Sequence, residues 1–377
     1  MSTVLIASDK FKGSLTAAQV AEAVGAGVRR TRPDADVVAV PVADGGDGTL
    51  AAAVAAGFAF VPVTATGPTG EPVATGFARR GEVAVVELAD ACGLVRLVAG
   101  PAPLTAGSRG AGDVMAAAVD AGCTRVVLGI GGSASTDGGA GMLAALGARL
   151  LDATGAELRP GGAALADLAA VDLDPLSTRL AGVEVVVACD VDNPLTGPVG
   201  AAATYGPQKG ADPEQVRLLD EALGHFADVV ARATGDDRRD AAGAGAAGGV
   251  GFAALALLGA RLRAGIDLVL DLVGFHAALA DADLVVTGEG ALDEQTLHGK
   301  APAGVASAAR AAGVPVVAVC GVNRLDDVRL RAAGIGTAYA LTDIGTDLQQ
   351  CLADGAPLLE RLGARIAAEH LSIKENA

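Results

Sequence analysis

Two aspartates stand two positions apart where an apolar run ends, at Asp190 and Asp192. Residues with this spacing point to the same side of an extended chain, so both carboxylates are expected on one face. Such a pair suits a Mg²⁺ site, or one metal ligand beside one catalytic base. Asn193 adds a neutral oxygen, and Lys209 follows in the next loop. Because an acidic pair is costly unless something binds it, the segment favours a functional site over a structural turn.

A second candidate site lies in residues 7–15, where an apolar run passes into an Ala-rich segment with helical periodicity. Lys10 and Lys12 stand in the connecting loop, and Ser14 or Thr16 can cap the helix. A helix N-terminus favours an anion, so lysines placed there can hold a carboxylate or a phosphate. The alternative is a solvated loop between a strand and a helix.

Paired glycines follow another apolar run in residues 41–49, where Asp44 and Asp47 flank them. Glycine lets the backbone come close to a ligand, and carboxylates suit Mg²⁺ or sugar hydroxyls. The segment is therefore a candidate ligand-binding loop. An Asp-Gly turn without a ligand is the alternative.

A Gly- and Ser-rich loop joins a predicted buried strand to an apolar helix within residues 129–143. Its backbone N–H groups, at Gly131, Gly132 and Ser133, can cradle phosphate oxygens. The loop is not of the Walker A type, since GxxxxGK[ST] is absent from the whole chain, and it does not follow the dinucleotide pattern GxGxxG. The pattern leaves a phosphate cradle and a plain loop equally open.

Residues 287–302 place Glu289 and Asp293 after a predicted strand, with Lys300 at the start of the next segment. Acids and a lysine at one strand end fit a site for an anion and a metal. A polar loop without a ligand is the alternative.

Residues 241–260 carry no charge and reach the ~20-residue length of a membrane span. Gly and Ala dominate the first half, however, so we expect a glycine-rich loop that leads into a buried helix. Within it, Gly245 and Gly248 are candidates for backbone contacts to a nucleotide or substrate.

Short apolar runs alternate with segments of helical periodicity along the chain. This alternation predicts an α/β fold with mainly parallel sheets, which would position these groups. In such sheets ligands bind at the carboxyl ends of strands, where the polar motifs fall. The predicted strands are residues 4–8, 37–43, 83–88, 125–130, 183–189, 283–287 and 315–320, and the clearest helices are residues 17–30 and 304–312.

Two domains are expected for a chain of 377 residues. The segment 57–81 carries alternating β-branched residues and Gly-Pro and Thr-Gly turns, which predicts a hairpin at the entry to an inserted domain. We expect one discontinuous domain from residues 1–60 plus 281–377 and an inserted α/β domain from residues 61–280. The 110–132 segment fits either.

Composition limits the partners and the compartment. A net charge of −16 argues against nucleic acid and anionic membranes. Five cysteines without a CxxC pattern predict free, mostly buried thiols in a reducing compartment. The first residues show no targeting segment, so a cytoplasmic protein is expected.

The most specific segments are residues 189–195, 205–211, 243–249 and 287–300. They and the other motifs occur in the order found in the bacterial type I glycerate kinase family, which the chain resembles along essentially its whole length. That family usually has other residues at three of these positions: Ser where Lys10 stands, Glu where Asp47 stands, and Asn where Thr136 stands.

The resemblance implies a two-domain α/β enzyme, with a discontinuous Rossmann-like domain, a second domain inserted into it and an active site in the cleft. The implied reaction transfers a phosphoryl group from MgATP to D-glycerate, giving ADP and 2-phosphoglycerate rather than 3-phosphoglycerate. D-Glycerate and ATP are the implied small-molecule partners, and a monomer or homodimer is expected.

Roles for individual residues follow as hypotheses. Asp190 is the preferred base for the substrate hydroxyl, and Asp192 helps to hold Mg²⁺. Lys12 and Lys209 contact phosphate or carboxylate. The other candidates for substrate and phosphate contacts are Lys10, Ser14, Asp44, Asp47, Gly131, Gly132, Ser133 and Lys300. The candidates for nucleotide or metal contacts are Gly245, Gly248, Glu289 and Asp293.

Three other classes of protein remain possible from the residues alone. A dinucleotide-dependent dehydrogenase is disfavoured by the missing GxGxxG. A non-catalytic organic-acid sensor has no need for an aspartate pair. A kinase of another small hydroxy acid is the nearest alternative, because spacing does not fix the substrate.

Overall fold

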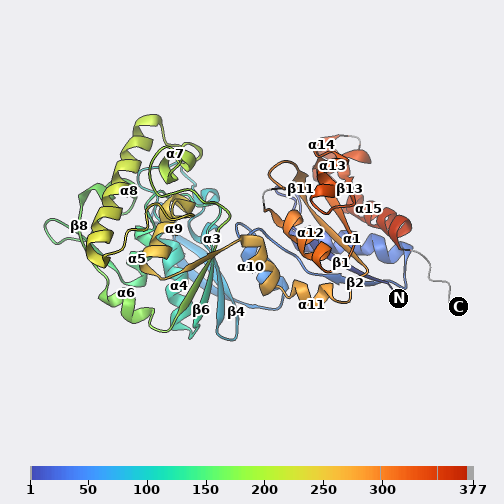
Figure 1. Cartoon of the computed structure of the whole chain (residues 1–377), viewed down its shortest axis with the longest axis horizontal. Helices are drawn as coiled ribbons and strands as arrows, with labels where there is room; N and C mark the ends of the chain where they lie inside the picture. Colours follow the sequence, from blue (N-terminus) through green and yellow to red (C-terminus); the bar gives the residue numbers. More distant parts are fainter. Residues whose placement is uncertain (1, 298, 346, 372–377) are drawn as a thin grey trace. The chain divides into compact units, whose positions relative to one another are not determined.

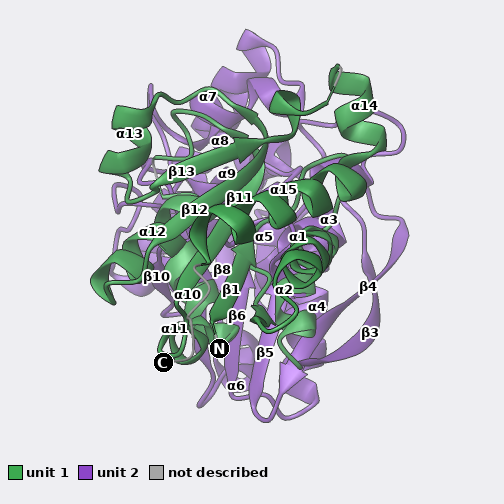
Figure 2. Ribbon diagram, turned by 90° about the vertical axis from the view of Figure 1, so that its right-hand side faces the viewer, with its two compact units in different colours: residues 1–44, 51–57, 266–377 green, residues 45–50, 58–265 purple. Residues whose placement is uncertain are grey.

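The chain folds into two compact units in a computed structural model, which describes residues 2–297, 299–345 and 347–371. Unit 1 comprises residues 1–44, 51–57 and 266–377, and unit 2 comprises residues 45–50 and 58–265 (Figure 2). The strand predicted at residues 125–130, whose domain the sequence left open, lies in unit 2.

Unit 1 is built on a parallel sheet of five strands in the order β13-β12-β11-β1-β2 (Figure 1). The strands are β1 (Thr3–Ser8), β2 (Asp36–Ala39), β11 (Leu284–Leu292), β12 (Val316–Asn323) and β13 (Thr337–Ala340). The helices are α1 (Ala17–Thr31), α2 (Thr49–Ala55), α10 (Gly265–Leu272), α11 (Phe275–Leu279), α12 (Ala301–Ala311), α13 (Asp327–Ala332), α14 (Leu348–Ala353) and α15 (Gly355–His370), with the short turn η4 (Leu341–Asp343).

Alternation along β1 supplies two separate cores in unit 1. Val4 and Ile6 pack into the core that contains α1 and α15, whereas Leu5 and Ala7 pack into the core that contains α12. Successive side chains of a strand point to opposite faces, so a continuous apolar run serves both faces of the sheet. The carboxyl end of β1 is thereby held inside the sheet, between β11 and β2.

Unit 2 has a mixed sheet of six strands in the order β10-β9-β6-β5-β4-β3, of which β5, β6, β9 and β10 are parallel. The strands are β3 (Ala59–Thr66), β4 (Pro72–Arg80), β5 (Val83–Glu87), β6 (Arg125–Gly129), β9 (Glu184–Ala188) and β10 (Arg261–Arg263), beside a separate pair, β7 (Arg149–Asp152) and β8 (Leu168–Asp172).

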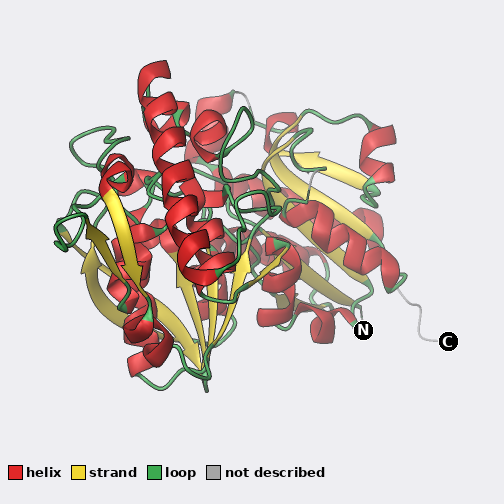
Figure 3. Cartoon of the chain, turned by 60° about the vertical axis from the view of Figure 1, so that its left-hand side comes forward, coloured by secondary structure: helices red, strands yellow, loops and turns green. Residues whose placement is uncertain are grey.

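Helices and short 3-10 turns surround the strands of unit 2 (Figure 3). The helices are α3 (Leu88–Cys92), α4 (Arg109–Asp120), α5 (Ala140–Leu146), α6 (Asp174–Arg179), α7 (Ala201–Tyr205), α8 (Pro213–Thr234) and α9 (Ala246–Leu257), and the turns are η1 (Leu94–Arg96), η2 (Gly162–Asp167) and η3 (Pro207–Lys209). Side chains from α4, α5, α8 and α9 share one apolar core with β5, β6 and β9.

The predicted α/β fold with parallel sheets is confirmed, and so is the hairpin, because β3 and β4 pair antiparallel. Three predicted strand ends were wrong, the first of them in the strand predicted at residues 315–320, which is β12 and runs to Asn323. β2 stops at Ala39 rather than residue 43, although the N–H groups of Val40 and Val42 still donate to the carbonyls of Ile6 and Ser8 in β1. β11 continues to Leu292 rather than residue 287, because its pairing with β12 runs on past the glycines.

The apolar stretch 241–260 contains α9, a largely buried helix that a glycine-rich loop precedes, as predicted. Within the described ranges, no helix has the length and apolar character that crossing a membrane requires. All five cysteines are free thiols, as expected, and four of them are buried.

Candidate active site

In unit 2, the loop after β6 presents backbone N–H groups that the protein itself leaves unused. Within the described residues, the N–H groups of Gly131, Gly132 and Ser133 have no hydrogen-bond acceptor. The loop is held through other atoms, since Leu94 N–H donates to Gly132 O at 3.0 Å and Ala134 N–H donates to Cys92 O at 3.1 Å. Successive free N–H groups at the carboxyl edge of a parallel sheet form a concavity that suits an anion.

Lys209 lies beneath this loop rather than in solvent. Its side chain follows the turn η3 and is only 2% exposed. The ammonium donates to Ser133 Oγ at 2.8 Å and to the carbonyl of Ser135 at 2.5 Å. Burial lowers the lysine pKa to about 8, against the opposing influence of Asp137 and Cys92.

Asp137 closes the same loop from inside the core, and the sequence analysis missed it. Its carboxylate is 1% exposed and accepts hydrogen bonds from Ser108 N–H, Ser108 Oγ–H, Gly139 N–H and Gly141 N–H, at 2.8 to 3.2 Å. These bonds join the starts of α4 and α5 to the loop. The DGG sequence at residues 137–139 was a visible signal, because an aspartate followed by two glycines can fold around its own carboxylate.

The two glycines predicted to contact a nucleotide are used for packing inside unit 2. A Cβ on Gly248, whose φ is +71°, would lie 2.1 Å from the carbonyl oxygen of Ser135. Gly248 O also accepts a bond from Gly138 N–H at 2.9 Å, and Gly245 N–H donates to Asn193 O at 2.8 Å. Their contact with a nucleotide stays a prediction.

Asp190 and Asp192 follow β9 at the same sheet edge and are both exposed. Asp190 Oδ1 accepts a 2.7 Å hydrogen bond from Gly265 N–H, which fixes the orientation of that carboxylate. Asn193 Oδ1 accepts a hydrogen bond from the Tyr205 hydroxyl at 2.7 Å, and its use as a further oxygen donor beside the pair stays a prediction. The carboxylates of Asp190 and Asp192 are the charged candidates for metal ligands at this edge.

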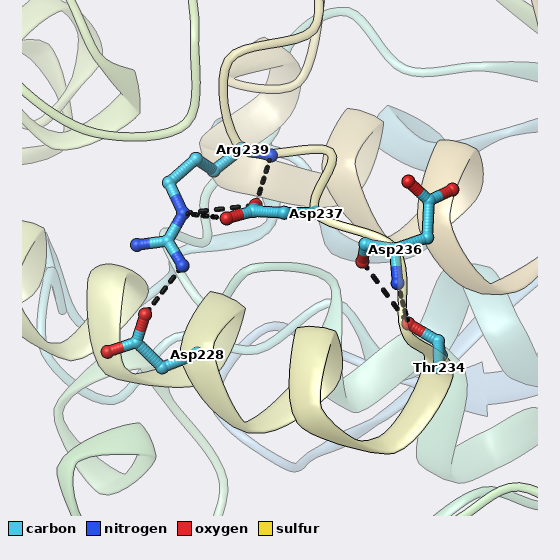
Figure 4. A network of polar contacts seen from close by, with 5 residues as sticks. All are labelled: Asp228, Thr234, Asp236, Asp237 and Arg239. Carbon is cyan, nitrogen blue, oxygen red and sulfur yellow. Dashed lines mark hydrogen bonds and ion pairs between the residues drawn. The ribbon is translucent and has the colours of Figure 1, made fainter.

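A network behind the Asp190–Asp192 segment anchors it to the end of α8. Leu195 N–H donates to the carbonyl of Arg239 at 2.7 Å. The Arg239 guanidinium bonds to Asp228 and Asp237 at 2.5 to 3.0 Å (Figure 4). Because two acids hold this arginine, the chain is fixed at Leu195, just after the acidic segment.

The loop that carries Asp47 is attached to the same edge of the unit 2 sheet by Glu87, which sequence reasoning also missed. Glu87 ends β5, is 6% exposed, and accepts Gly48 N–H at 3.1 Å and Leu50 N–H at 3.0 Å through Oε2. Burial raises its pKa to about 7, with the Asp47 carboxylate adding to the effect. A carboxylate at the end of a predicted strand was the signal that could have identified Glu87.

In unit 1, acids gather at the carboxyl ends of β1 and β11. Burial raises the pKa of Asp9 to about 7, and the carboxylates of Asp44 and Glu289 raise it further. Glu289 lies inside β11, not after it as the sequence predicted. Burial raises the pKa of Glu289 as well, although the Thr296 hydroxyl and Lys300 oppose the shift.

Several predicted residues of unit 1 meet around Glu289. The Thr296 hydroxyl donates to Glu289 Oε1 at 2.5 Å, and Lys300 Nζ lies 3.8 Å from Glu289 Oε2. Asp293 N–H donates to Thr296 Oγ1 at 3.0 Å, which brings Asp293 into the same group. His298, in the same motif, lies outside the described residues.

The lysine loop of unit 1 passes beside β11. A Cβ on Gly290 would lie 3.4 Å from Lys12 N, so this glycine brings the loop close to the strand. Lys12 is exposed, whereas Lys10 and Ser14 are half-buried. The loop therefore offers one lysine to solvent near the acids of unit 1.

The aspartate pair fits a magnesium ion by the chemistry of its donors. Mg²⁺ is usually held by one or two protein carboxylates, with phosphate oxygens and waters as the remaining ligands. Asp190 and Asp192 supply that number. Among the side chains that the structure describes, no three His, Cys, Asp or Glu residues are grouped so as to hold a metal.

Comparison with known proteins extends over nearly the whole chain. The profile of the glycerate kinase family matches residues 4–371. The chain is 46% identical to a glycerate kinase from Bacillus subtilis (strain 168), with 97% of each chain covered. It is 44% identical to glycerate 2-kinase from Escherichia coli (strain K12), with 91% of each covered.

A solved structure agrees with these sequence relatives. The crystal structure of a protein from Salmonella typhimurium LT2, provisionally assigned as glycerate kinase 2, superposes with a TM-score of 0.86 at 43% identity, and 98% of each chain is covered. Sequence and fold thus match over the same length, and the chain belongs to the glycerate kinase family.

Proposed function

We propose that this protein transfers the γ-phosphoryl group of ATP to D-glycerate and releases ADP and phosphoglycerate. Membership of the glycerate kinase family along 97% of the chain supports the reaction class. A relative named glycerate 2-kinase, at 44% identity, supports 2-phosphoglycerate as the product rather than 3-phosphoglycerate.

The observation that carries the proposal is the set of unused N–H groups at Gly131, Gly132 and Ser133 in the described structure. A kinase must hold phosphoryl oxygens and stabilise the charge that develops on them. Backbone N–H groups at a sheet edge supply such donors without a lysine or arginine side chain. This matters in an acidic protein, which has 28 Lys and Arg residues against 44 Asp and Glu residues. We assign this loop to phosphate binding.

In unit 2 we assign proton transfer to Asp190. The Gly265 N–H at Oδ1 orients the carboxylate, which then accepts the proton of the glycerate hydroxyl. Asp192, with Asp190, is the pair that would hold Mg²⁺, and a bound Mg²⁺ neutralises phosphate charge. Asp47, carried by the loop that Glu87 holds, is assigned to substrate contact.

In unit 1 we assign anion binding to the lysine loop, with Lys12 as its exposed cation and Lys10 and Ser14 beside it. Lys300 partly neutralises Glu289. The acids Asp44, Glu289 and Asp293 are assigned to metal or ribose hydroxyls, for which carboxylate oxygens are suitable acceptors.

We further propose that the two units are the two domains expected from the sequence, with boundaries near residues 44–58 and 265. A cytoplasmic location accords with five free thiols, because reducing compartments keep cysteines unpaired. A monomer or homodimer remains our expectation for the oligomeric state.

A coupled assay of ADP release tests the function. Purified protein is given MgATP with D-glycerate, L-glycerate or glycolate in separate reactions. We expect turnover with D-glycerate and far less with the other two acids. Turnover with glycolate alone would assign the protein to another hydroxy acid, and binding of D-glycerate without any consumption of ATP would make it a sensor.

Replacing the proposed base gives a residue-level test. Asp190→Asn keeps the shape but cannot accept the hydroxyl proton, so kcat should fall by about 10²–10⁴-fold. Asp167→Asn, which changes an exposed acid of unit 2 with only a 3.9 Å ion pair to Arg159, is the matched control and should keep normal kcat. Near-normal turnover of a folded Asp190→Asn variant would remove Asp190 from this role.

A further inference from the structure

Lys209 differs from the other candidate cations in the way its charge is held. Its side chain is 2% exposed, and its ammonium donates to one hydroxyl and one carbonyl oxygen, Ser133 Oγ and Ser135 O. Among the described side chains, no carboxylate lies within 4 Å of its nitrogen. A buried ammonium bound by neutral oxygens is costly to desolvate, so ion-pair stabilisation does not account for its place.

Both acceptors of Lys209 belong to the loop with the unused N–H groups. The two bonds connect residues 76 and 74 positions apart in the chain, so they fix the loop after β6 from a separate turn. Together with the backbone bonds to Cys92 and Leu94, they hold the loop from inside the protein. They leave the N–H groups of residues 131–133 without an acceptor among the described residues.

The surroundings of Lys209 hold its ammonium at these two oxygen atoms. The Asp137 carboxylate favours its charged form but is committed to donors on Ser108, Gly139 and Gly141. Gly248 packs so closely against the same loop that a Cβ there would lie 2.1 Å from Ser135 O. The carbonyl that Lys209 binds is therefore enclosed.

We propose that Lys209 is a positioning residue, whose buried ammonium sets the shape of the 131–135 loop so that its N–H groups can receive a phosphoryl oxygen. Lys209 thus acts through Ser133 and Ser135 and does not itself bind the phosphate. The proposal rests on the proposed kinase function for its catalytic consequence, but its structural consequence holds in the protein without substrates.

Two variants separate positioning from direct contact. Lys209→Met keeps the apolar stem and removes the ammonium, and Ser133→Ala keeps the ammonium and removes one acceptor. Losing well-placed N–H donors should lower kcat by about 10²–10³-fold in Lys209→Met. The double variant should be no more than about twofold worse than Lys209→Met, because the two residues act through one contact. Multiplying effects of the two single changes would overturn the proposal.

Amide NMR of the substrate-free protein provides the readout that a direct phosphate contact would not move. We expect the resonances of Gly131, Gly132 and Ser133 to shift, and hydrogen exchange of residues 131–137 to quicken, in Lys209→Met and, less strongly, in Ser133→Ala. Arg217→Met, which changes an exposed cation of α8, should leave both unchanged. Unshifted loop amides in a folded variant with lost turnover would make Lys209 a direct ligand.

The kinetic assay and the amide NMR together also separate this proposal from the kinase function on which it rests. If the loop amides shift in Lys209→Met but the wild-type protein shows no glycerate-dependent turnover, the positioning role is sustained and the kinase assignment is refuted. If Lys209→Met does not fold, Ser133→Ala decides the matter alone. Unchanged amides and normal kcat in that variant would refute the contact through Ser133.

Discussion

Two buried hydroxyls in the loop after β6 have no hydrogen-bond partner among the described residues, namely those of Ser135 and Thr136. An unsatisfied buried polar group costs about 1–3 kcal/mol of stability. Thr136→Val replaces the hydroxyl by a methyl of the same shape. Its free energy of unfolding, measured by urea denaturation, should therefore be unchanged or about 1 kcal/mol higher than that of the wild type.

The matched comparison for that variant is Thr296→Val in unit 1. Thr296 Oγ1 donates to Glu289 and accepts from Asp293 N–H, so its loss should cost about 1.5–3 kcal/mol. If Thr136→Val were destabilised to the same extent, the Thr136 hydroxyl would have a hydrogen-bond partner in solution and would not be unsatisfied.

Glu87 gives the protein a defined pH dependence of stability. Its pKa is about 7 in the folded protein and 4.5 in the unfolded reference. Between these values the folded state keeps a proton that the unfolded state has released, so the free energy of unfolding falls as pH rises from 4.5 to 7. Glu87→Gln removes this loss. It should match the wild type near pH 4.5 and be more stable by up to about 3 kcal/mol at pH 8.

Denaturant titrations of wild type and Glu87→Gln across pH 4.5 to 8 measure that difference directly. Comparing the two proteins cancels the contribution of Asp9, whose raised pKa acts in the same direction and is present in both. A difference that does not grow with pH would show that Glu87 ionises normally in the folded protein.

At the residue scale, the sequence could identify which groups stand at strand ends but not how each is used. Lys12 and Lys209 looked alike as cations in glycine-rich loops, yet one is exposed and the other is buried under Ser133 and Ser135. Burial depends on segments more than 70 positions away, which no local pattern records. The hydrogen bond from the Tyr205 hydroxyl to Asn193 was also not visible in the sequence, because Tyr205 lies in a later helix.

At the element scale, the contact between α9 and the loop after β6 depends on Gly248. Alanine there would be strained at a φ of +71° and would place its Cβ 2.1 Å from Ser135 O. We expect Gly248→Ala to lower the free energy of unfolding by about 2–5 kcal/mol, from left-handed strain and overpacking together. Thermal or urea denaturation measures the loss.

Gly235→Ala is the control for backbone strain alone. Gly235 ends α8 at a φ of +75°, and no atom lies within 4 Å of a Cβ built there. Its replacement should cost about 1–2 kcal/mol, the strain of a left-handed alanine. Equal losses in the two variants would mean that the close approach of Gly248 to the loop is absent in solution.

The elements themselves were largely predictable, because buried parallel strands are continuous apolar runs and their helices carry a 3.6-residue period. The errors fell where one residue type has two meanings. Gly288 and Gly290 suggested a loop, but they lie within β11 and allow close packing, whereas β2 stops at Ala39 inside an apolar run. Whether a strand ends or continues at such a residue depends on its pairing with the neighbouring strand, which the local sequence does not contain.

At the scale of the whole molecule, the chain forms two units from four crossings between them, near residues 44, 50, 57 and 265. Each unit has its own sheet, and each sheet presents its candidate site residues at or just beyond the carboxyl ends of parallel strands. The sequence indicated an inserted domain through the β3–β4 hairpin. It did not reveal the short return of residues 51–57 to unit 1, since nothing in that Ala-rich segment marks a boundary.

The central claim is phosphoryl transfer to D-glycerate, and ³¹P NMR of one reaction tests it most directly. The protein is incubated with MgATP and D-glycerate while the phosphorus signals are followed. We expect the γ-phosphate signal of ATP to be lost as the signals of ADP and 2-phosphoglycerate grow in equal amounts. Unchanged ATP, or conversion to inorganic phosphate without any phosphoglycerate signal, would contradict it.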